Sequence, residues 1–88
     1  MKGTKQQLKS IIMELVYRRG AGKTICPSEA ARAFAKEDNW RRQMDTAREA
    51  ASELRQENSI YIEQGGNPVE LEQTSGPVRL RLREEADE

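Results

Sequence analysis

The chain has no histidine and a single cysteine, Cys26, among its 88 residues. Histidine and cysteine are the usual zinc ligands, so we expect no metal site and no bound cofactor. A lone cysteine cannot form a disulfide within the chain, which is typical of proteins from a reducing compartment. Nucleophilic catalysis by Cys26 would need a neighbouring base, and no histidine is present to act as one. The composition therefore predicts a protein that is not an enzyme.

Long hydrophobic runs are also missing. The longest apolar cluster, residues 11–17, is interrupted by Glu14. It does not approach the length of a membrane span or of a signal-peptide core. We therefore expect a cytoplasmic protein that has no membrane partner, and nothing in the sequence indicates a small-molecule ligand.

An excess of positive charge is missing as well, because fifteen Lys and Arg residues balance fifteen Asp and Glu residues. Proteins dedicated to nucleic-acid binding usually carry such an excess. The distribution is uneven, however: residues 1–23 contain six basic residues against Glu14 alone. The acids gather at the other end of the chain, in the tail Glu84, Glu85, Asp87 and Glu88. A neutral total therefore leaves room for one basic face.

The first third of the chain has the apolar spacing of two helices. A first helix is predicted over about residues 5–19, and the glycines that follow would end it. A short second helix is predicted over about residues 27–35, because Pro27 suits the first helical position and Glu29 suits a capping box. The residues expected to face the core are Leu8, Ile11, Ile12, Leu15 and Val16 in the first helix, and Ala30, Ala31 and Ala33 or Phe34 in the second.

A third helix is predicted after a polar break at residues 36–39, with Asn39 or Asp45 as its cap and an end near Glu57. Its expected buried stripe is Trp40, Met44, Ala47, Ala51 and Leu54.

Beyond Asn58 the hydrophobic period changes to two, which is typical of strands. Ile60 and Ile62 form one alternating segment, and the other is Val78, Leu80 and Leu82. Between them lie two strong turn signals, Gly65-Gly66-Asn67-Pro68 and Ser75-Gly76-Pro77. The second half of the chain therefore predicts a β-hairpin.

Three helices followed by a hairpin predict the α+β class and a winged helix, in which a three-helix helix-turn-helix core carries a C-terminal β-hairpin wing. An isolated hairpin is marginal in water, so the strands must dock on the helices. We expect one domain over residues 1–88, with flexible ends at about 1–4 and 84–88.

The predicted third helix and last strand carry most of the candidate binding residues. A helix-turn-helix fold places such a helix in the major groove, and arginine binds phosphates and base edges. Lys2, Lys5 and Lys9 would add phosphate contacts. The candidate nucleic-acid-binding residues are Arg41, Arg42, Arg48, Arg55, Arg79 and Arg81.

Surface ion pairing is the alternative interpretation of these arginines. Acidic residues interleave with the helix arginines at spacings that allow ion pairs on a helix surface, namely Asp45, Glu49 and Glu53. Glu63 could neutralise Arg79 or Arg81 across the hairpin. Glu29 could likewise pair with Arg32. The balanced charge then favours a protein-interaction or assembly module, to which Val69 and Leu71 in the extended segment 67–75 would contribute apolar contacts.

The segment Gly20-Ala21-Gly22-Lys23-Thr24 ends like a phosphate-binding loop, but it lacks that loop's context. The motif needs a glycine where Tyr17 stands, a strand before the loop and a long helix after it. A helix end with a polar turn explains the segment.

The run from Thr24 to Ala33, with Cys26-Pro27-Ser28-Glu29 at its centre, resembles the signature of a family of small bacterial proteins of unknown function. The later motifs Trp40-Arg41, Gln64-Gly65-Gly66 and Gly76-Pro77-Val78-Arg79-Leu80 match in the same order, so that the resemblance covers about residues 11–82. The family is similar to winged-helix domains, and it implies that fold without implying an activity. The chain departs from the family at Asp45, where proline is usual, and at Asn58, where glycine is common. Asp45 can still cap a helix, and Asn58 tolerates the left-handed conformation of a glycine.

Overall fold

The computed structural model describes residues 3–20, 22–35, 37–71 and 74–83. Its elements are α1 (Thr4–Arg19), β1 (Thr24–Ile25), α2 (Pro27–Phe34), the 3-10 helix η1 (Glu37–Gln43), α3 (Met44–Gln56), β2 (Ile60–Gln64), β3 (Asn67–Pro68) and β4 (Arg79–Leu82). These residues form three α-helices and a four-stranded antiparallel sheet, which confirms the predicted α+β class. Most of the two ends that were expected to be flexible lies outside the described residues, including Lys2 and the acidic tail. Within the first of them, Gly3 is the N-cap of α1 and Thr4 is its first residue.

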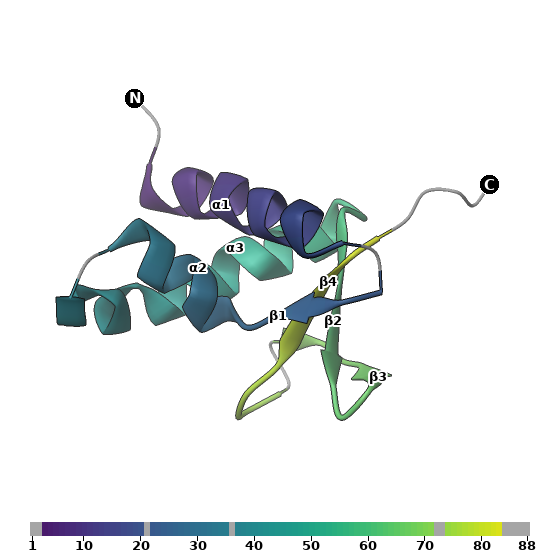
Figure 1. Ribbon diagram of the computed structural model, residues 1–88. Coiled ribbons are helices and arrows are strands. Elements are labelled where there is room, and N and C mark those ends of the chain that lie inside the picture. Colours follow the sequence, from purple (N-terminus) through teal and green to yellow (C-terminus); the bar gives the residue numbers. More distant parts are fainter. Residues whose placement is uncertain (1–2, 21, 36, 72–73, 84–88) are drawn as a thin grey trace.

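The helices pack together on one side of the molecule, and the longer strands extend away from them (Figure 1). α1 contacts both α2 and α3, and α3 also contacts β2. The strand order is β1-β4-β2-β3, so the last strand lies between the first strand and β2. Thr24 is thereby paired with Arg81, and Ile25 with Leu80. This pairing joins β1, which lies just before α2, to β4, the last strand in the sequence.

The two-residue period of the strands sets which side chains enter the core. Ile62 lies opposite Leu80 in the β2–β4 register, and all of their side-chain surface faces the interior. Val78, just before β4, is also buried, whereas Leu82 is half-buried. The alternation predicted for both segments is therefore confirmed.

One cluster of apolar side chains connects the helices to the sheet. Burying a large aliphatic side chain contributes roughly 1.5–3 kcal/mol, and the alanines of α2 and α3 let those helices approach closely. Ile11 and Leu15 only partly face this cluster. Its fully buried members are Leu8, Ile12 and Val16 from α1, Ile25 from β1, Ala30 and Ala31 from α2, Ala47, Ala50, Ala51 and Leu54 from α3, and Ile60, Ile62, Val78 and Leu80 from the sheet region.

The start of α2 agrees with the capping-box prediction. Cys26 is the N-cap residue, Pro27 occupies the first helical position, and the Glu29 carboxylate accepts a hydrogen bond from the Cys26 backbone N–H at 3.0 Å. This bond satisfies one of the donors that a helix start leaves open. Ala30 and Ala31 are buried as predicted, Phe34 is half-buried, and Ala33 is exposed.

The third helix begins later than predicted. Residues 37–43 form η1, and α3 starts at Met44 with Gln43 as its N-cap, so neither Asn39 nor Asp45 caps it. Trp40 therefore lies on η1, half-buried beside α2, rather than on the buried stripe of α3. The four-residue spacing from Trp40 to Met44 suits an α-helix, but the tighter 3-10 turn carries the ring toward α2 instead.

The predicted turn at residues 65–68 is shorter than expected. Only Gly65 and Gly66 turn, and their φ values of 62° and 84° are those of a two-residue hairpin loop that glycine favours. Asn67 and Pro68 then pair with Gln64 and Glu63 as β3. Proline is tolerated there because β3 is the edge strand of the sheet that the described residues form.

Asn58 ends α3 in the left-handed region, with φ of 65°. Its N–H donates to the Arg55 carbonyl, and the Ser59 N–H donates to the Leu54 carbonyl, both at 2.9 Å. These two bonds are the Schellman pattern, in which a residue of positive φ follows the helix. The expectation that Asn58 tolerates the left-handed conformation is confirmed.

Asn58→Ala should unfold more easily than Asn58→Gly by about 1 kcal/mol, since a Cβ disfavours the left-handed region by roughly 1–2 kcal/mol and glycine does not. Both variants lose the side-chain bond that Arg83 donates to Asn58 Oδ1, so the difference between them isolates the backbone conformation. Urea denaturation measures it. Equal stability of the two variants would argue against the left-handed cap.

Candidate nucleic-acid interface

The six arginines predicted to bind nucleic acid lie in pairs on three elements. Arg41 and Arg42 lie on η1, Arg48 and Arg55 on α3, and Arg79 and Arg81 on β4. Each pair has a different environment, which decides how much of its hydrogen-bonding capacity is left for a ligand.

The α3 pair binds the segment between β3 and β4. Arg48 donates from Nη1 to the Gly76 carbonyl at 3.3 Å and from Nη2 to the Thr74 carbonyl at 3.2 Å. Arg55 forms an ion pair with Glu70 at 2.8 Å. The sequence predicts these two arginines on a helix that enters the major groove. In the structure they instead bind the segment between β3 and β4 of the same chain.

The solvent-facing side of α3 is acidic. Asp45, Glu49 and Gln56 are exposed, and the first two lie one helical turn apart on the same side. Carboxylates in this position repel the phosphates of a duplex, which carries one charge per roughly 1.7 Å of its length. The outer face of α3 is thus poorly suited to enter a nucleic-acid groove.

The lysines of α1 bind the acids of α3. Lys5 lies 2.5 Å from Glu53, and Lys9 lies 3.2 Å from Glu53 and 2.7 Å from Glu57. The hydrogen bond with Glu53 raises the pKa of Lys5, that with Glu57 raises the pKa of Lys9, and the bond from Lys5 lowers the pKa of Glu53. These lysines, predicted as phosphate contacts, are therefore neutralised locally.

An open groove of about 380 Å³ adjoins these ion pairs. Two cations and two carboxylates line it, so its charge selects neither an anion nor a cation. Its lining residues are Lys5, Arg48, Glu49, Ser52, Glu53 and Leu71.

The Lys5–Glu53 pair predicts a dependence of stability on pH. Because folding lowers the pKa of Glu53, its contribution is complete above the ordinary glutamate pKa and is lost as the pH falls through the lower folded value. Glu53→Gln should therefore flatten the decline of the unfolding free energy below about pH 4.3. Urea denaturation between pH 2.5 and pH 7 measures the effect. In a Lys5→Met background the same substitution should change the acid decline less, and an unchanged effect there would contradict the ion-pair assignment.

Arg81 of β4 is paired across the sheet. It donates from Nε and Nη2 to Glu63 Oε2 at 3.0 and 2.7 Å, and its guanidinium carbon lies 4.6 Å from the centre of the Tyr61 ring. The predicted neutralisation by Glu63 is confirmed, with Arg81 rather than Arg79 as the partner.

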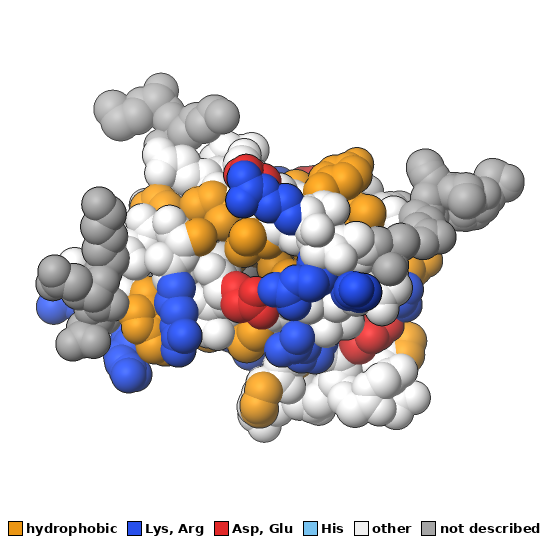
Figure 2. All heavy atoms as spheres, in the orientation of Figure 1, with side chains coloured by type: hydrophobic (Ala, Val, Ile, Leu, Met, Phe, Trp, Pro, Cys, Tyr) orange, Lys and Arg blue, Asp and Glu red, His pale blue; other side chains and the backbone are white. Residues whose placement is uncertain are grey.

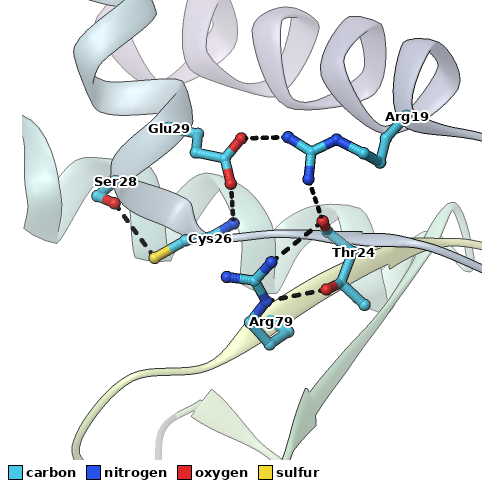
Figure 3. Close-up of polar contacts among 6 residues, drawn as sticks. All are labelled: Arg19, Thr24, Cys26, Ser28, Glu29 and Arg79. Carbon is cyan, nitrogen blue, oxygen red and sulfur yellow. Dashed lines mark hydrogen bonds and ion pairs between the residues drawn. The ribbon is translucent and has the colours of Figure 1, made fainter.

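Arg79 meets Arg19 at the backbone of Thr24, as Figure 3 shows. Arg79 donates to Thr24 Oγ1 at 2.9 Å and to its carbonyl at 3.2 Å, and Arg19 donates to the same carbonyl at 2.7 Å. Arg19 also forms an ion pair with Glu29 at 2.6 Å, so the predicted Glu29–Arg32 pair is wrong. Two guanidiniums and a single carboxylate leave this corner with a net positive charge.

Arg32 and Arg41 both stack on Trp40. Their guanidinium carbons lie 4.4 and 4.7 Å from the centre of the ring, within the range of cation–π attraction. Both arginines are exposed, whereas the ring is half-buried against the core. The tryptophan thus holds two cations at the junction of α2 and η1.

Five exposed cations that have no carboxylate partner among the described side chains form what we call the basic surface. Its members are exposed, and none forms an ion pair with an acid whose side chain the structure describes. One of them, Arg79, also donates to Thr24. Arg83 is likewise exposed and donates to Asn58, but it lies beyond the end of β4 and is not included.

The members of the basic surface form two groups. Lys23 and Arg79 lie at the β1–β4 pair, and Arg32, Arg41 and Arg42 lie where α2 contacts η1. Along the chain, only Cys26 separates β1 from α2. Lys and Arg side chains spread over α2 and the β1–β4 strands in Figure 2, with acidic groups between some of them. The basic surface consists of Lys23, Arg32, Arg41, Arg42 and Arg79.

Three of these five residues were candidates from the sequence, namely Arg41, Arg42 and Arg79. In the sequence, Lys23 belongs to the segment that ends like a phosphate-binding loop, and Arg32 is predicted only as a partner of Glu29. The Trp40-Arg41 dipeptide is a local signal for an arginine–aromatic contact. Arg32 precedes Trp40 by eight positions, and this spacing gives no such signal.

None of the helices within the described ranges combines the length and the hydrophobicity that a membrane span requires. In the same ranges no group of three or more His, Cys, Asp or Glu residues is placed to hold a metal ion. Cys26 is half-buried and lies 3.2 Å from the Ser28 hydroxyl, which donates to its sulfur (Figure 3).

The fold and the basic surface define a small α+β domain with a charged, largely polar exterior. Residues 5–83 match the family described as Protein of unknown function (DUF3253), and the chain belongs to that family. A comparison with curated proteins finds no match.

Proposed function

We propose that the chain is a winged-helix domain that binds duplex nucleic acid through its basic surface. The order of helices and strands supports this fold, with α2 and α3 as the helix-turn-helix pair. The β2–β3 hairpin and the segment that leads to β4 would form the wing. Fold likeness alone does not give a function, so the proposal depends on the site.

The observation that carries the proposal is the separation of paired from unpaired cations. Lys5, Lys9 and Arg55 are neutralised by acids on or beside α3. The five residues of the basic surface have no such partner among the described side chains. An exposed cation without a carboxylate partner can release counterions from the phosphate backbone, which drives sequence-independent binding.

The proposed mode differs from base reading by α3. Since Asp45 and Glu49 face solvent there, we propose that phosphate contacts supply the affinity and that α3 is not inserted deeply into the major groove. Binding of this kind would depend strongly on salt and only weakly on sequence.

Fluorescence anisotropy with a labelled random duplex across a salt series tests the proposal. Each phosphate contact contributes about −0.9 to the slope of log affinity against log salt, so three to five contacts should give roughly −2.7 to −4.5. Absence of binding at low salt would remove the proposed function.

A protein-interaction module is the second candidate, and the acidic outer face of α3 together with the neutral net charge favours it. The apolar residues that the sequence offered for a partner, Val69 and Leu71, pack in part against the core, so a partner would meet mainly polar surface. Sedimentation velocity would show self-association that weakens with salt and with Asp45→Asn/Glu49→Gln. A monomer at all concentrations would exclude the self-assembling form of this module.

A further inference from the structure

Trp40 brings together two cations from different elements. Arg32 comes from the last turn of α2, and Arg41 follows the tryptophan on η1. Their distances to the ring centre bound the separation of the two guanidinium carbons at about 9 Å. The ring itself is anchored, because it packs against the buried cluster while both arginines remain exposed.

Stacking occupies the flat face of a guanidinium and leaves its N–H donors, which lie in the plane, directed outward. Among the residues that the structure describes, neither Arg32 nor Arg41 donates a hydrogen bond or forms an ion pair. Charge-assisted N–H···O bonds are about 2.7–2.9 Å long, so one phosphate group can accept bonds from two guanidiniums that reach it from the same side of the ring. The pair therefore has the unused donors of an anion site, and a shared phosphate requires that both guanidiniums reach it from one side of Trp40.

We propose that Arg32 and Arg41 form a phosphate clamp, organised by Trp40, that binds a phosphodiester group of the nucleic-acid backbone. This inference rests on the proposed function, and it identifies one contact within the basic surface. Stacking limits the rotamers of both side chains before the ligand arrives, which lowers the entropy lost on binding. The clamp should consequently contribute more affinity than the other cations of that surface.

Replacing Arg32 and Arg41 by lysine distinguishes a clamp from a general positive field, because the two predict different affinities for duplex. Lysine keeps the charge of arginine but lacks its planar fork and stacks less well on an aromatic face. Arg32→Lys/Arg41→Lys should therefore weaken binding if the clamp exists and leave it unchanged if charge alone matters. Arg42→Lys is the control, because Arg42 is exposed on the same 3-10 helix and is not among the arginines with a cation–π contact in the described part of the chain.

The experiment measures binding of a labelled random duplex by anisotropy at low salt, with circular dichroism and thermal unfolding as checks of the fold. We expect about tenfold weaker binding for Arg32→Lys/Arg41→Lys and less than a twofold change for Arg42→Lys. Trp40 is the single tryptophan of the chain, so its emission should change when duplex is added to the wild type. If the wild type binds and Arg32→Lys/Arg41→Lys binds equally well, the clamp is overturned while the proposed function stands. If the wild type does not bind, the proposed function fails first, and the clamp fails with it.

Discussion

Ile12→Ala should lower the free energy of unfolding by about 2–5 kcal/mol. Ile12 has no exposed surface and lies at the middle of the α1 face that packs on the shared core. The substitution removes buried methyl and methylene groups and leaves a cavity in the core, which accounts for the size of the expected loss. Because a small domain is stable by only about 5–15 kcal/mol, the change would remove a large part of the total.

Tyr17→Ala on the same helix is the matched control. Tyr17 is 66% exposed, so its replacement should change the unfolding free energy by less than about 0.5–1 kcal/mol. Urea denaturation followed by circular dichroism measures both variants. Similar losses for the two would mean that α1 does not pack in the described orientation.

Lys23→Gln/Arg42→Gln should reduce the salt slope of duplex binding by about 1.8, since two phosphate contacts are removed. At 0.1 M salt this corresponds to roughly 10- to 60-fold weaker binding. Both residues are exposed and have no ion-pair partner among the described side chains. The described cation–π partners of Trp40 are Arg32 and Arg41, so this prediction is independent of the phosphate clamp.

Arg48→Gln/Arg55→Gln also removes two positive charges, here from α3, and serves as the comparison. These arginines bind Thr74, Gly76 and Glu70, so we expect a modest loss of stability and a nearly unchanged salt slope. If the α3 variant loses the slope and the Lys23→Gln/Arg42→Gln variant keeps it, the basic surface is wrongly placed.

The sequence predicts α1, α2 and the strands β2 and β4 well because their signals are local. Helical and alternating periods depend only on neighbouring residues, and Pro27 and Glu29 mark the start of α2 within three positions. Even the left-handed conformation of Asn58 follows from its place after a helical stripe. These elements agree with the structure to within a few residues.

The short strands are different. β1 and β3 have two residues each, which is too short for any period to appear. β1 becomes a strand only because β4, more than fifty residues later in the chain, lies beside it. The start of α3 is obscured for another reason, since the Trp40–Met44 spacing fits an α-helix although residues 37–43 form tighter turns.

Whether an arginine can bind a ligand depends on its contacts with residues far away in the sequence, and the spacing of neighbouring residues does not show these contacts. Sequence reasoning pairs a helix arginine with acids three or four residues away, whereas Arg48 finds carbonyl groups 26 and 28 residues later. Arg79 likewise binds Thr24, 55 residues earlier. The candidate residues therefore emerge from the sequence, but the division into occupied and available cations requires the fold.

A nuclear magnetic resonance titration of the ¹⁵N-labelled chain with unlabelled random duplex at low salt tests the location of binding most directly. The largest shifts should fall on the backbone amides of Lys23, Thr24, Arg32, Arg41 and Arg42 and on the Trp40 indole N–H, and they should reverse when salt is added. Shifts concentrated instead on Asp45, Glu49 and Gln56 would place the duplex on the acidic face of α3 and contradict binding through the basic surface.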